Sequence, residues 1–383
     1  MSQVKISGLI QLTSPLHVAS PDKEWFYDRE SNYISKSKGG DKSSPVNRTT
    51  TTSVVGADGV IEQGIPILPA NGLRGRLRRH ATAIILDALS RQGERITIDA
   101  FHGMTCGAIT GKPVKGVFSI KELLAERAHL FLGLFGGGEK VSRSAYLVSD
   151  LVPYTELMKD IGAIPQNDTP TPSSVITKKA INSANGREDS LSGVFLMNRL
   201  DDVKNGQSEK TMSAIKNYEE SAQAWFSEIQ KTESVDANGK TKDERAAVSL
   251  TNMMNVELVR AGTRFYFNLE LFESATPSQA GLMLMSIQQL VEKNQLGGLI
   301  AKGCGKFNAK ELKIIANGEE CDLFSPDGKS LNESCEFIYD SLKAVNDSLN
   351  SMTADYINSA FIRTIDETKK AKSDSKEALE IAS

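Results

Sequence analysis

The residues best suited to chemistry are four arginines within six positions, which follow a short polar pair; the set is Asn71, Gly72, Arg74, Arg76, Arg78 and Arg79. Leu73 and Leu77 recur at helical spacing, which predicts the start of a helix whose arginines leave from its outer side. The first amides of a helix lack internal partners, its N-terminus carries positive dipole charge, and guanidinium forks match phosphate oxygens. A solvated basic face is the alternative, but cations there oppose the dipole by about 0.3–1 kcal/mol each. We therefore predict that these residues bind a phosphate-bearing anion.

A glycine-rich loop near residue 300 is the second candidate. Gly297 and Gly298 are followed by Lys302 and then by the run 303–306, Gly-Cys-Gly-Lys. Glycine lets backbone amides approach a ligand closely, and lysines add positive charge. The spacing fits neither the triphosphate-binding nor the dinucleotide-binding fingerprint. We predict a second phosphate-binding loop made by Gly297, Gly298 and Lys302, with tight turns as the alternative use of the glycines.

Catalytic constellations are poor in this sequence. No serine or cysteine nucleophile motif accompanies His17 or His102, and the positions of His80 and His129 in predicted helices indicate structural roles. A metal could use the spacing of His102 and Cys106, but a four-coordinate site needs a second ligand pair. The cysteines lie apart without a CxxC pair, which fits neither a disulfide framework nor a zinc ribbon; they are Cys106, Cys304, Cys321 and Cys335. We expect reduced thiols, no metal and no cofactor.

Composition limits the partners of the chain. The 383 residues include 45 Lys and Arg against 48 Asp and Glu, a net charge of −3. No general cationic field therefore draws the molecule to nucleic acid or to an anionic membrane, so a nucleic-acid site has to be a local patch. No uncharged apolar stretch approaches about 18 residues, and the first residues lack the order of a secretory signal. We expect a soluble, cytoplasmic protein with no membrane partner.

Apolar periodicity predicts the elements that carry these residues. Alternation predicts strands over 4–12, 145–149 and 306–314, and a hairpin with one wet face over 256–271. Helical spacing predicts three helices: one capped by Asn71, one over 123–132 that stops at Gly133, and one from Pro277 to Val291. The polar stretches 22–64, 160–193 and 201–250 cannot cover a core. They predict an extended arm and two insertions, with one helix over 212–229.

Without the insertions, the predicted order is strand, helix, strand, two strands, helix, strand. This is the split βαβ arrangement of a ferredoxin-like sheet. We therefore predict an α+β fold with a ferredoxin-like (RRM-like) palm and large insertions. The charged C-terminal segment is typical of a solvated tail or a frayed helix.

Six short motifs occur in the order found in one known family. The segment 67–78, ILPANGLRGRLR, resembles the IPGSSLKGxxR signature of the RAMP superfamily, whose members belong to CRISPR effector complexes. Smaller pieces are similar to further motifs of that family: 14–18 to tgLHIG, 44–46 to DSPV, 134–136 to LFG, 259–265 to lpaGtxF and 296–306 to lGGxxxxGxGK. With the first strand, they span residues 4–314. Among RAMP proteins the sequence most resembles the backbone subunit, the seventh CRISPR-associated family.

The resemblance implies one elaborated domain over residues 1–383. Its palm would comprise about 1–20, 65–150 and 254–315, with a loop or finger insertion at 21–64, thumb and helical insertions at 160–253 and a C-terminal extension at 316–383. In the family, the finger region and a thumb hairpin kink the RNA at regular intervals. The arm 22–64 and the segment 175–198 would supply the loop and the thumb. From these segments we add four residues to the predicted RNA-binding set: Arg48, Lys178, Lys179 and Asn182.

One position departs from the family pattern. In type III relatives that cut target RNA, the aspartate of the DSPV loop is catalytic, and Ser43 stands at the matching position here. A hydroxyl cannot hold a metal or act as a base as a carboxylate does. Together with the length and the large insertions, this makes the sequence most similar to the type IV backbone subunit. Asp41 is an alternative replacement if the loop is offset by two positions.

The resemblance implies a non-catalytic subunit of a CRISPR ribonucleoprotein. Copies would polymerise along guide RNA (crRNA) in a helical filament, beside other effector subunits, and present the guide to target DNA or RNA. In some type IV subtypes a helicase joins the complex. Three alternatives stay open: a target-RNA endonuclease using Asp41 or Asp22, a guide-processing ribonuclease using His17, and a structural protein without RNA.

Overall fold

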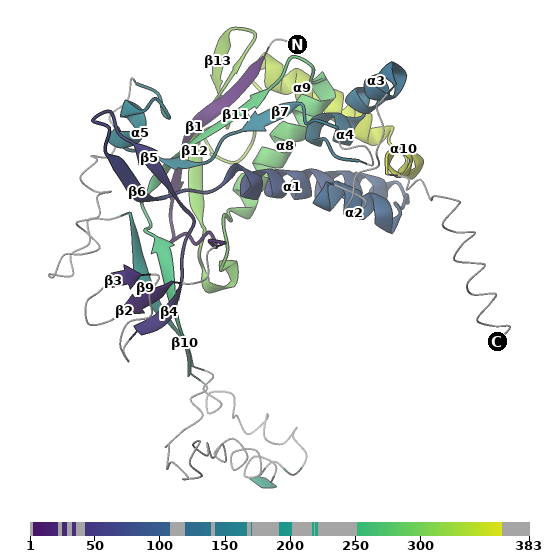
Figure 1. Cartoon of the computed structure of the whole chain (residues 1–383). Helices are drawn as coiled ribbons and strands as arrows, with labels where there is room; N and C mark the ends of the chain where they lie inside the picture. Colours follow the sequence, from purple (N-terminus) through teal and green to yellow (C-terminus); the bar gives the residue numbers. More distant parts are fainter. Residues whose placement is uncertain are drawn as a thin grey trace. The chain divides into compact units, whose positions relative to one another are not determined.

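The computed structural model describes residues 3–21, 25–28, 33–35, 43–107, 119–138, 142–166, 170, 191–200, 217, 219–220 and 251–361 (Figure 1). The chain forms two compact units. Unit 1 comprises Met1–Pro21, Thr49–Gly193 and Leu258–Ser383, and unit 2 comprises Asp22–Arg48 and Val194–Glu257.

Unit 1 combines a sheet with helices. Its strands are β1 (Val4–Leu12), β5 (Thr51–Val55), β6 (Ile61–Pro66), β7 (Tyr146–Val148), β8 (Val152–Pro153), β11 (Arg264–Leu271), β12 (Phe307–Ala316) and β13 (Glu319–Asp322). Its helices are α1 (Ala70–Arg91), α2 (Ile98–Cys106), α3 (Ile120–Ala128), α4 (Leu130–Phe135), α5 (Glu156–Asp160), α8 (Pro277–Lys293), α9 (Glu336–Asn350) and α10 (Ala354–Ser359), with a 3₁₀ turn at Ile300–Lys302.

The main sheet of unit 1 has the first strand near its centre. Its order is β13-β12-β1-β11-β7, with β8 also beside β11, and each of these pairs is antiparallel. The register places Ile6 of β1 between Leu269 of β11 and Ile314 of β12. The chain passes from β1 through α1 to β7 and from β11 through α8 to β12, and each path skips one strand position. The fold class is therefore α+β, as the sequence predicts.

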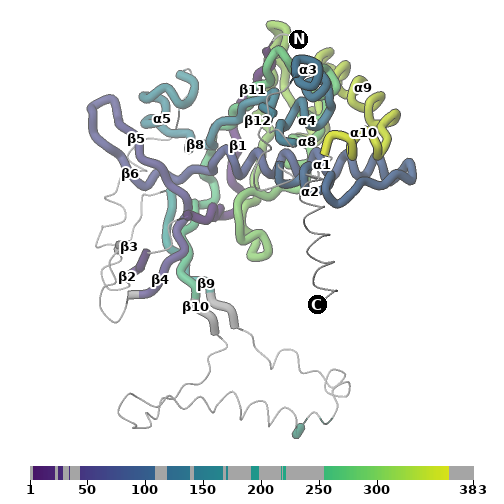
Figure 2. Tube along the Cα trace, turned by 45° about the vertical axis from the view of Figure 1, so that its right-hand side comes forward, coloured from purple at the N-terminus to yellow at the C-terminus, as the bar shows by residue number. Residues whose placement is uncertain are grey.

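The core of unit 1 lies between one face of this sheet and the helices. Val4, Ile6 and Ile10 of β1 are buried there, because alternate side chains of a strand point to the same face. Figure 2 shows α1, α4, α8 and α9 on that side of the sheet, and the β5–β6 hairpin and α5 on the other. On the second face, Leu9 and Tyr266 pack against a smaller buried cluster; it consists of Ile65, Tyr154, Leu157, Met158, Ile164 and Leu191.

Unit 2 is built around a five-stranded sheet. Its strands are β2 (Phe26–Asp28), β3 (Tyr33–Ser35), β4 (Ser43–Asn47), β9 (Ser192–Leu200) and β10 (Thr251–Val259), in the order β3-β2-β4-β10-β9. The pairs of β2 with β3 and β4 are antiparallel, and β4 runs parallel to β10.

The strongest periodic patterns are confirmed by the structure. The first strand spans Val4–Leu12 as predicted, and Tyr146–Val148 and Phe307–Ala316 lie at the predicted strands near 145–149 and 306–314. The helix from Pro277 runs to Lys293, with Thr276 and Gln279 forming a capping box at its start. In each case apolar side chains at a fixed period meet a buried face, which makes the pattern specific.

The helical predictions need three corrections. The cap of α1 is Pro69 rather than Asn71, which lies inside the first turn. The helix predicted over 123–132 is two helices that break at His129, and Gly133 lies within the second one rather than ending it. α3 buries no residue in unit 1, so its leucines do not mark a core face. The short helix α2 carries only three buried residues and was not predicted.

The strand predictions need two corrections. The polar stretch 22–64 contains β2 to β5 and most of β6, and its Thr and Val residues within 49–55 are β-branched types that favour strands. The hairpin over 256–271 is wrong as a paired unit: β10 pairs with β4 while β11 pairs with β1, β7 and β8. Alternation predicts a strand but does not choose its neighbour. Of the helix predicted over 212–229, only Asn217, Glu219 and Glu220 are among the described residues, and the tail after Phe361 lies outside them.

The break between α3 and α4 is made by the side chain of His129. Its Nδ1 accepts the amides of Phe131 at 3.2 Å and Leu132 at 3.1 Å, so the ring caps α4. Its Nε2 faces the carbonyl oxygen of Tyr356 at 3.4 Å, and the two rings stack with centroids 4.3 Å apart. An imidazole that accepts at Nδ1 has to be neutral, and burial lowers the pKa of His129 to about 4.

This arrangement predicts that unit 1 loses stability in mild acid. The folded pKa of His129, about 4, lies below its ordinary value of 6.5, so its contribution is complete above pH 6.5 and is lost as the pH falls toward 4. We expect the free energy of unfolding to fall by about 2 kcal/mol between pH 7 and pH 5 from this group. Urea denaturation at both pH values measures the free energy of unfolding. His129→Asn is the control, because asparagine can also cap a helix but does not titrate. An equal pH dependence in the two proteins would contradict the prediction.

Candidate nucleic-acid interface

The N-terminal end of α1 is already partly neutralised by the chain. A carboxylate oxygen of Asp150 accepts the amide of Ala70 at 2.7 Å, and the amide of Gly72 donates to Pro69 at 2.9 Å. Asn71 and Gly72 are exposed in the first turn. The anion that the sequence predicts at this end is therefore supplied in part by Asp150.

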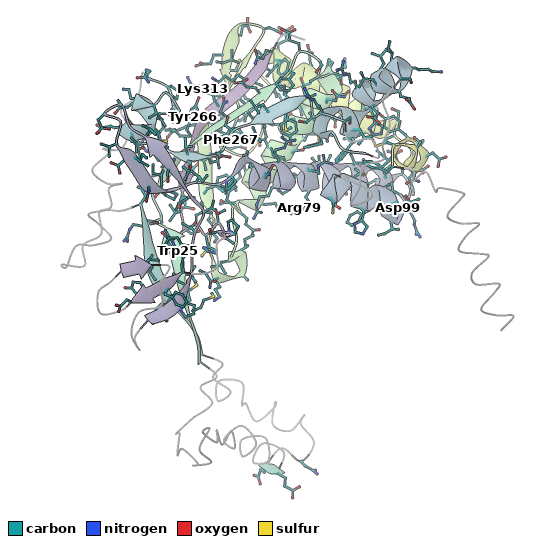
Figure 3. The ribbon with its side chains drawn as sticks, viewed as in Figure 1. Trp25, Arg79, Asp99, Tyr266, Phe267 and Lys313 are labelled. Carbon is teal, nitrogen blue, oxygen red and sulfur yellow. The ribbon has the colours of Figure 1, made fainter. Side chains whose placement is uncertain are left out.

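Arg76 and Arg79 lie at the centre of a cationic group that the two central helices build together. The guanidinium of Arg76 donates to the carbonyl oxygen of Gly297, and burial and then repulsion from Arg79 lower its pKa. Arg79 is exposed on α1 (Figure 3). Burial lowers the pKa of His80, a hydrogen bond with Gln289 raises it, and Arg76, Lys293 and Arg79 lower it further. We call Arg76, Arg79, His80 and Lys293 the α1–α8 basic cluster.

No carboxylate pairs with this cluster in the described part of unit 1. Among the described residues, ion pairs join Arg48 to Glu257, Arg91 to Asp87 and Lys313 to Glu320, and none of these includes a residue of the cluster. Neighbouring positive charges contribute to the lowered pKa values of Arg76 and His80, and like charges without a counter-ion repel one another. A phosphate backbone would supply the missing negative charge.

Arg74 lies beside the cluster on the same helix. Its guanidinium donates to the hydroxyl of Ser144 at 3.3 Å and lies 5.3 Å from the ring centre of Tyr146. Burial raises the pKa of Tyr146, and the neighbouring Arg74 and Arg78 oppose that rise. Arg74 thus contacts the hydroxyl groups of Ser144 and Tyr146, and the five N–H donors of a guanidinium exceed these two contacts.

Arg78 is held by carbonyl groups of the chain, and its use in phosphate binding stays a prediction. Its guanidinium donates to the carbonyl oxygens of Phe135 at 2.7 Å and Gly136 at 2.9 Å, the last residue of α4 and its cap. It also lies 5.4 Å from the ring centre of Phe131. Burial lowers the pKa of Arg78. This side chain therefore completes the C-terminal end of α4, where carbonyl groups lack helical partners.

The glycine loop is also used for packing rather than as an amide cradle. The amide of Gly298 donates to His17 at 2.7 Å, and that of Gly305 donates to Pro15 at 2.7 Å. These bonds fix the loop against the segment that follows β1. The amide of Gly298 is thus occupied, whereas Lys302 is exposed at the end of the 3₁₀ turn. Of the three predicted loop residues, only Lys302 offers a free charged group to the surface.

Gly297 is required by a close backbone approach. Its φ is +64°, and a methyl group at this position would lie 2.2 Å from the carbonyl oxygen of His17. We expect Gly297→Ala to lower the free energy of unfolding by about 2 kcal/mol more than Gly303→Ala. Gly303 is the matched control, because it has φ +79° but no atom within 4 Å of the added methyl group. Equal losses in urea denaturation of the two variants would show that the contact is unimportant.

In unit 2, Arg48 is held by the protein itself. Its Nε donates to a carboxylate oxygen of Glu257 at 2.5 Å, and its guanidinium lies 4.5 Å from the ring centre of Trp25. The side chains of Arg48 and Glu257 are only 11% and 2% exposed. Arg48 thus stabilises unit 2 instead of presenting a free cation. The other three residues predicted for the thumb, Lys178, Lys179 and Asn182, lie outside the described residues.

The loop that resembles DSPV is anchored by a residue the sequence analysis did not single out. Asn255 donates to the hydroxyl of Ser44 at 2.5 Å and to the carbonyl oxygen of Pro45 at 3.1 Å. The backbone of Ser43 pairs with Asp28, while Asp41 and Asp22 are not among the described residues. Within the described ranges, no three His, Cys, Asp or Glu side chains gather as metal ligands, and no helix is long and apolar enough to cross a membrane.

The structure thus reassigns part of the predicted site. Arg76 of α1 contacts Gly297 of the glycine-rich loop, so the two predicted groups of residues are neighbours. His80 and Lys293, which are not in the predicted set, belong to the same cluster as Arg76. The signal for His80 is its i+4 spacing from Arg76, but the contribution of α8 follows only from the packing of α1 on α8.

A family profile matches the family that the short motifs resemble. The profile of the RAMP superfamily matches residues 9–308. No curated protein matches the sequence. Among solved structures, a chain of a structure titled "Type IV-B CRISPR Complex" is similar over 87% of this chain and 99% of that chain, with 17% identity and a TM-score of 0.43. Because the family match covers most of its length, the chain belongs to the RAMP superfamily.

Proposed function

We propose that this RAMP protein is a non-catalytic backbone subunit of a type IV CRISPR effector, which binds the phosphate backbone of guide RNA. The observation that carries the proposal is the α1–α8 basic cluster, four cationic or titratable side chains without a carboxylate partner in the described part of unit 1. A net charge of −3 limits such binding to a local patch of this kind.

The proposed contacts position RNA without reading its sequence. Phosphate oxygens would meet Arg76, Arg79 and Lys293, with Arg74 and Lys302 beside them. Contacts to phosphate fix the register of a bound strand and carry no base information, which a subunit that covers arbitrary guides requires. Guide bases left open can then pair with target DNA or RNA.

The strand order supports the proposed palm. In the order β12-β1-β11-β7, two helical connections each skip one strand, which is the split βαβ order of a ferredoxin-like sheet. We propose that unit 1 contains this palm and that unit 2, formed from two separate stretches of chain, is an insertion serving as finger or thumb. Copies of the chain would stack along the guide beside other effector subunits, with a helicase in some subtypes.

The absence of catalysis is part of the proposal and rests on the residue at position 43. Ser43 replaces the carboxylate that cutting relatives use, and a hydroxyl is a poor metal ligand and a poor base. Labelled RNA complementary to the bound guide, incubated with Mg²⁺ and the purified complex, should stay intact. Cleavage at regular intervals that Asp41→Ala abolishes would identify an endonuclease instead.

RNA binding has a direct test. The protein purified from cells that express a guide should elute with RNA, seen as a raised ratio of absorbance at 260 to 280 nm. Fluorescence anisotropy with two labelled single-stranded RNAs of unrelated sequence should give equal affinities. Elution without nucleic acid, together with no binding to either RNA, would refute the proposal and favour a purely structural protein.

A further inference from the structure

A small hollow lies where α1, α8 and α9 meet, on the same two helices that carry the α1–α8 basic cluster. Its volume is about 230 Å³. Its lining includes Gln289 of α8 and Asn346 and Asn350 of α9, together with the apolar side chains of Met285 and Leu349. These residues meet because α8 packs on both α1 and α9. The hollow therefore combines amide groups with an apolar surface, and we call it the amide hollow.

The amide groups of α9 have no partner of their own in the described part of the chain. The side chain of Gln92 donates to a backbone carbonyl of α9 at 2.8 Å, and Asp87 forms an ion pair with Arg91 at 3.0 Å. Asn346 and Asn350 are exposed and form no side-chain hydrogen bond with another described residue. Each amide group carries an acceptor oxygen and two donor hydrogens. The hollow thus offers neutral donors and acceptors to a ligand, while its charged pair is already matched.

Helical spacing places the amide hollow next to the basic cluster. On α8, Gln289 lies four residues before Lys293, and on α1, Ile84 of the hollow lies four residues after His80. Four residues are about one turn, or about 6 Å along a helix, and they share one face of it. A phosphate group at the cluster would therefore bring the sugar of a neighbouring nucleotide within reach of the hollow.

We propose that the amide hollow binds ribose 2′-hydroxyl groups of the guide and so makes this subunit select RNA over DNA, an inference that rests on the proposed function. The 2′-hydroxyl both donates and accepts a hydrogen bond, so an amide group can bind it in either direction. Every nucleotide of RNA carries this group and DNA lacks it. Phosphate contacts cannot make the distinction, because both nucleic acids have the same phosphates.

A base edge is the other part of a nucleotide that amide groups bind. Asparagine and glutamine there prefer particular bases, above all adenine. A subunit that covers arbitrary guides has to bind every sequence equally, which a ribose contact permits. The amide hollow therefore fits the sugar better than the base.

Fluorescence anisotropy of the full chain with matched oligonucleotides tests the selection. We expect single-stranded RNA to bind roughly tenfold more tightly than DNA of the same sequence that carries uracil in place of thymine. The ratio of the two affinities should change little with salt, because the contact is between neutral groups. RNA with 2′-fluoro groups should bind about as weakly as DNA, because fluorine cannot donate a hydrogen bond.

Variants of the amide hollow assign the selection to this place. In Gln289→Ala/Asn346→Ala the ratio should fall to roughly twofold or less, because two hydrogen-bonding groups are lost. Using the ratio to DNA removes any change in the phosphate contacts. Gln288→Ala is the matched control, since Gln288 is the preceding amide of α8 and does not line the hollow. Alanine favours helix at each position, and circular dichroism checks that the fold is kept.

Three results would overturn the inference. They are equal affinities of the unchanged chain for RNA and DNA, an unchanged ratio in Gln289→Ala/Asn346→Ala, and a change in that variant that depends on the RNA sequence, which would assign the hollow to a base. The proposed function fails separately, if the chain binds no RNA at all. Weaker binding of both RNA and DNA by Arg76→Ala/Arg79→Ala would support the phosphate contacts whatever the ratio is.

Discussion

Replacement of Arg76 and Arg79 by alanine is expected to weaken single-stranded RNA binding by roughly 100-fold, since each charge-assisted phosphate contact contributes about a factor of ten. The loss should be the same for unrelated RNA sequences, because phosphate contacts do not read bases. The slope of log affinity against log salt should become less steep by about 1.4 units for two lost contacts. Fluorescence anisotropy over a range of salt concentrations measures both quantities.

Arg91→Ala is the matched control for this double variant. Arg91 is a cation on the same helix, but its side chain is 72% exposed and pairs with Asp87 at 3.0 Å. Its loss should change RNA affinity less than about threefold, because an exposed pair contributes little. An unchanged salt slope in Arg76→Ala/Arg79→Ala would show that RNA binds elsewhere on the chain.

Arg78→Ala should destabilise the fold by about 4 kcal/mol. The substitution leaves two carbonyl groups at the end of α4 without their charged donor and removes the side chain that lies against Phe131. Buried acceptors without partners and a cavity both oppose folding. The midpoint of urea denaturation measures the loss.

Arg79→Ala is the control variant for Arg78→Ala, because comparing the two shows whether the loss of stability is specific to Arg78. Arg79 is the next residue and is exposed, so its removal should change the free energy of unfolding by less than about 0.5 kcal/mol. Arg78→Lys should recover part of the stability, because an ammonium group keeps the charge but not the fork. Normal stability with weak RNA binding in Arg78→Ala would instead return this residue to the RNA-binding set.

Periodicity predicts the elements whose apolar residues face one core, and it predicts them well. β1 and α8 are correct because their buried residues repeat at a fixed spacing. The break at His129 is invisible to periodicity, since it depends on a side chain that reaches two amides of the next helix. The predicted hairpin over 256–271 fails for a related reason: a strand pattern does not specify its neighbour, and β10 pairs with β4.

The predicted RNA-binding residues stay a prediction, but the structure shows which of their side chains the fold already holds. A cluster of arginines indicates a basic surface, yet the sequence does not tell which guanidinium groups the fold itself consumes. Arg78 and Arg48 are bound by carbonyl or carboxylate groups that lie far away in the sequence. Arg79 stays exposed because Leu73 and Leu77 turn the other face of α1 into the core, whereas Arg76 is half-buried and also donates to a distant carbonyl group, that of Gly297.

The position of β1 between β11 and β12 affects how the chain folds during synthesis. Val4 pairs with Leu271, and Ile6 pairs with Ile314, so β1 is synthesised long before its strand partners. At about 5–20 residues per second, the interval lasts for tens of seconds. During this time the apolar face of β1 has no sheet to join. Chains truncated before β11 should therefore expose the apolar residues of β1, which favours aggregation.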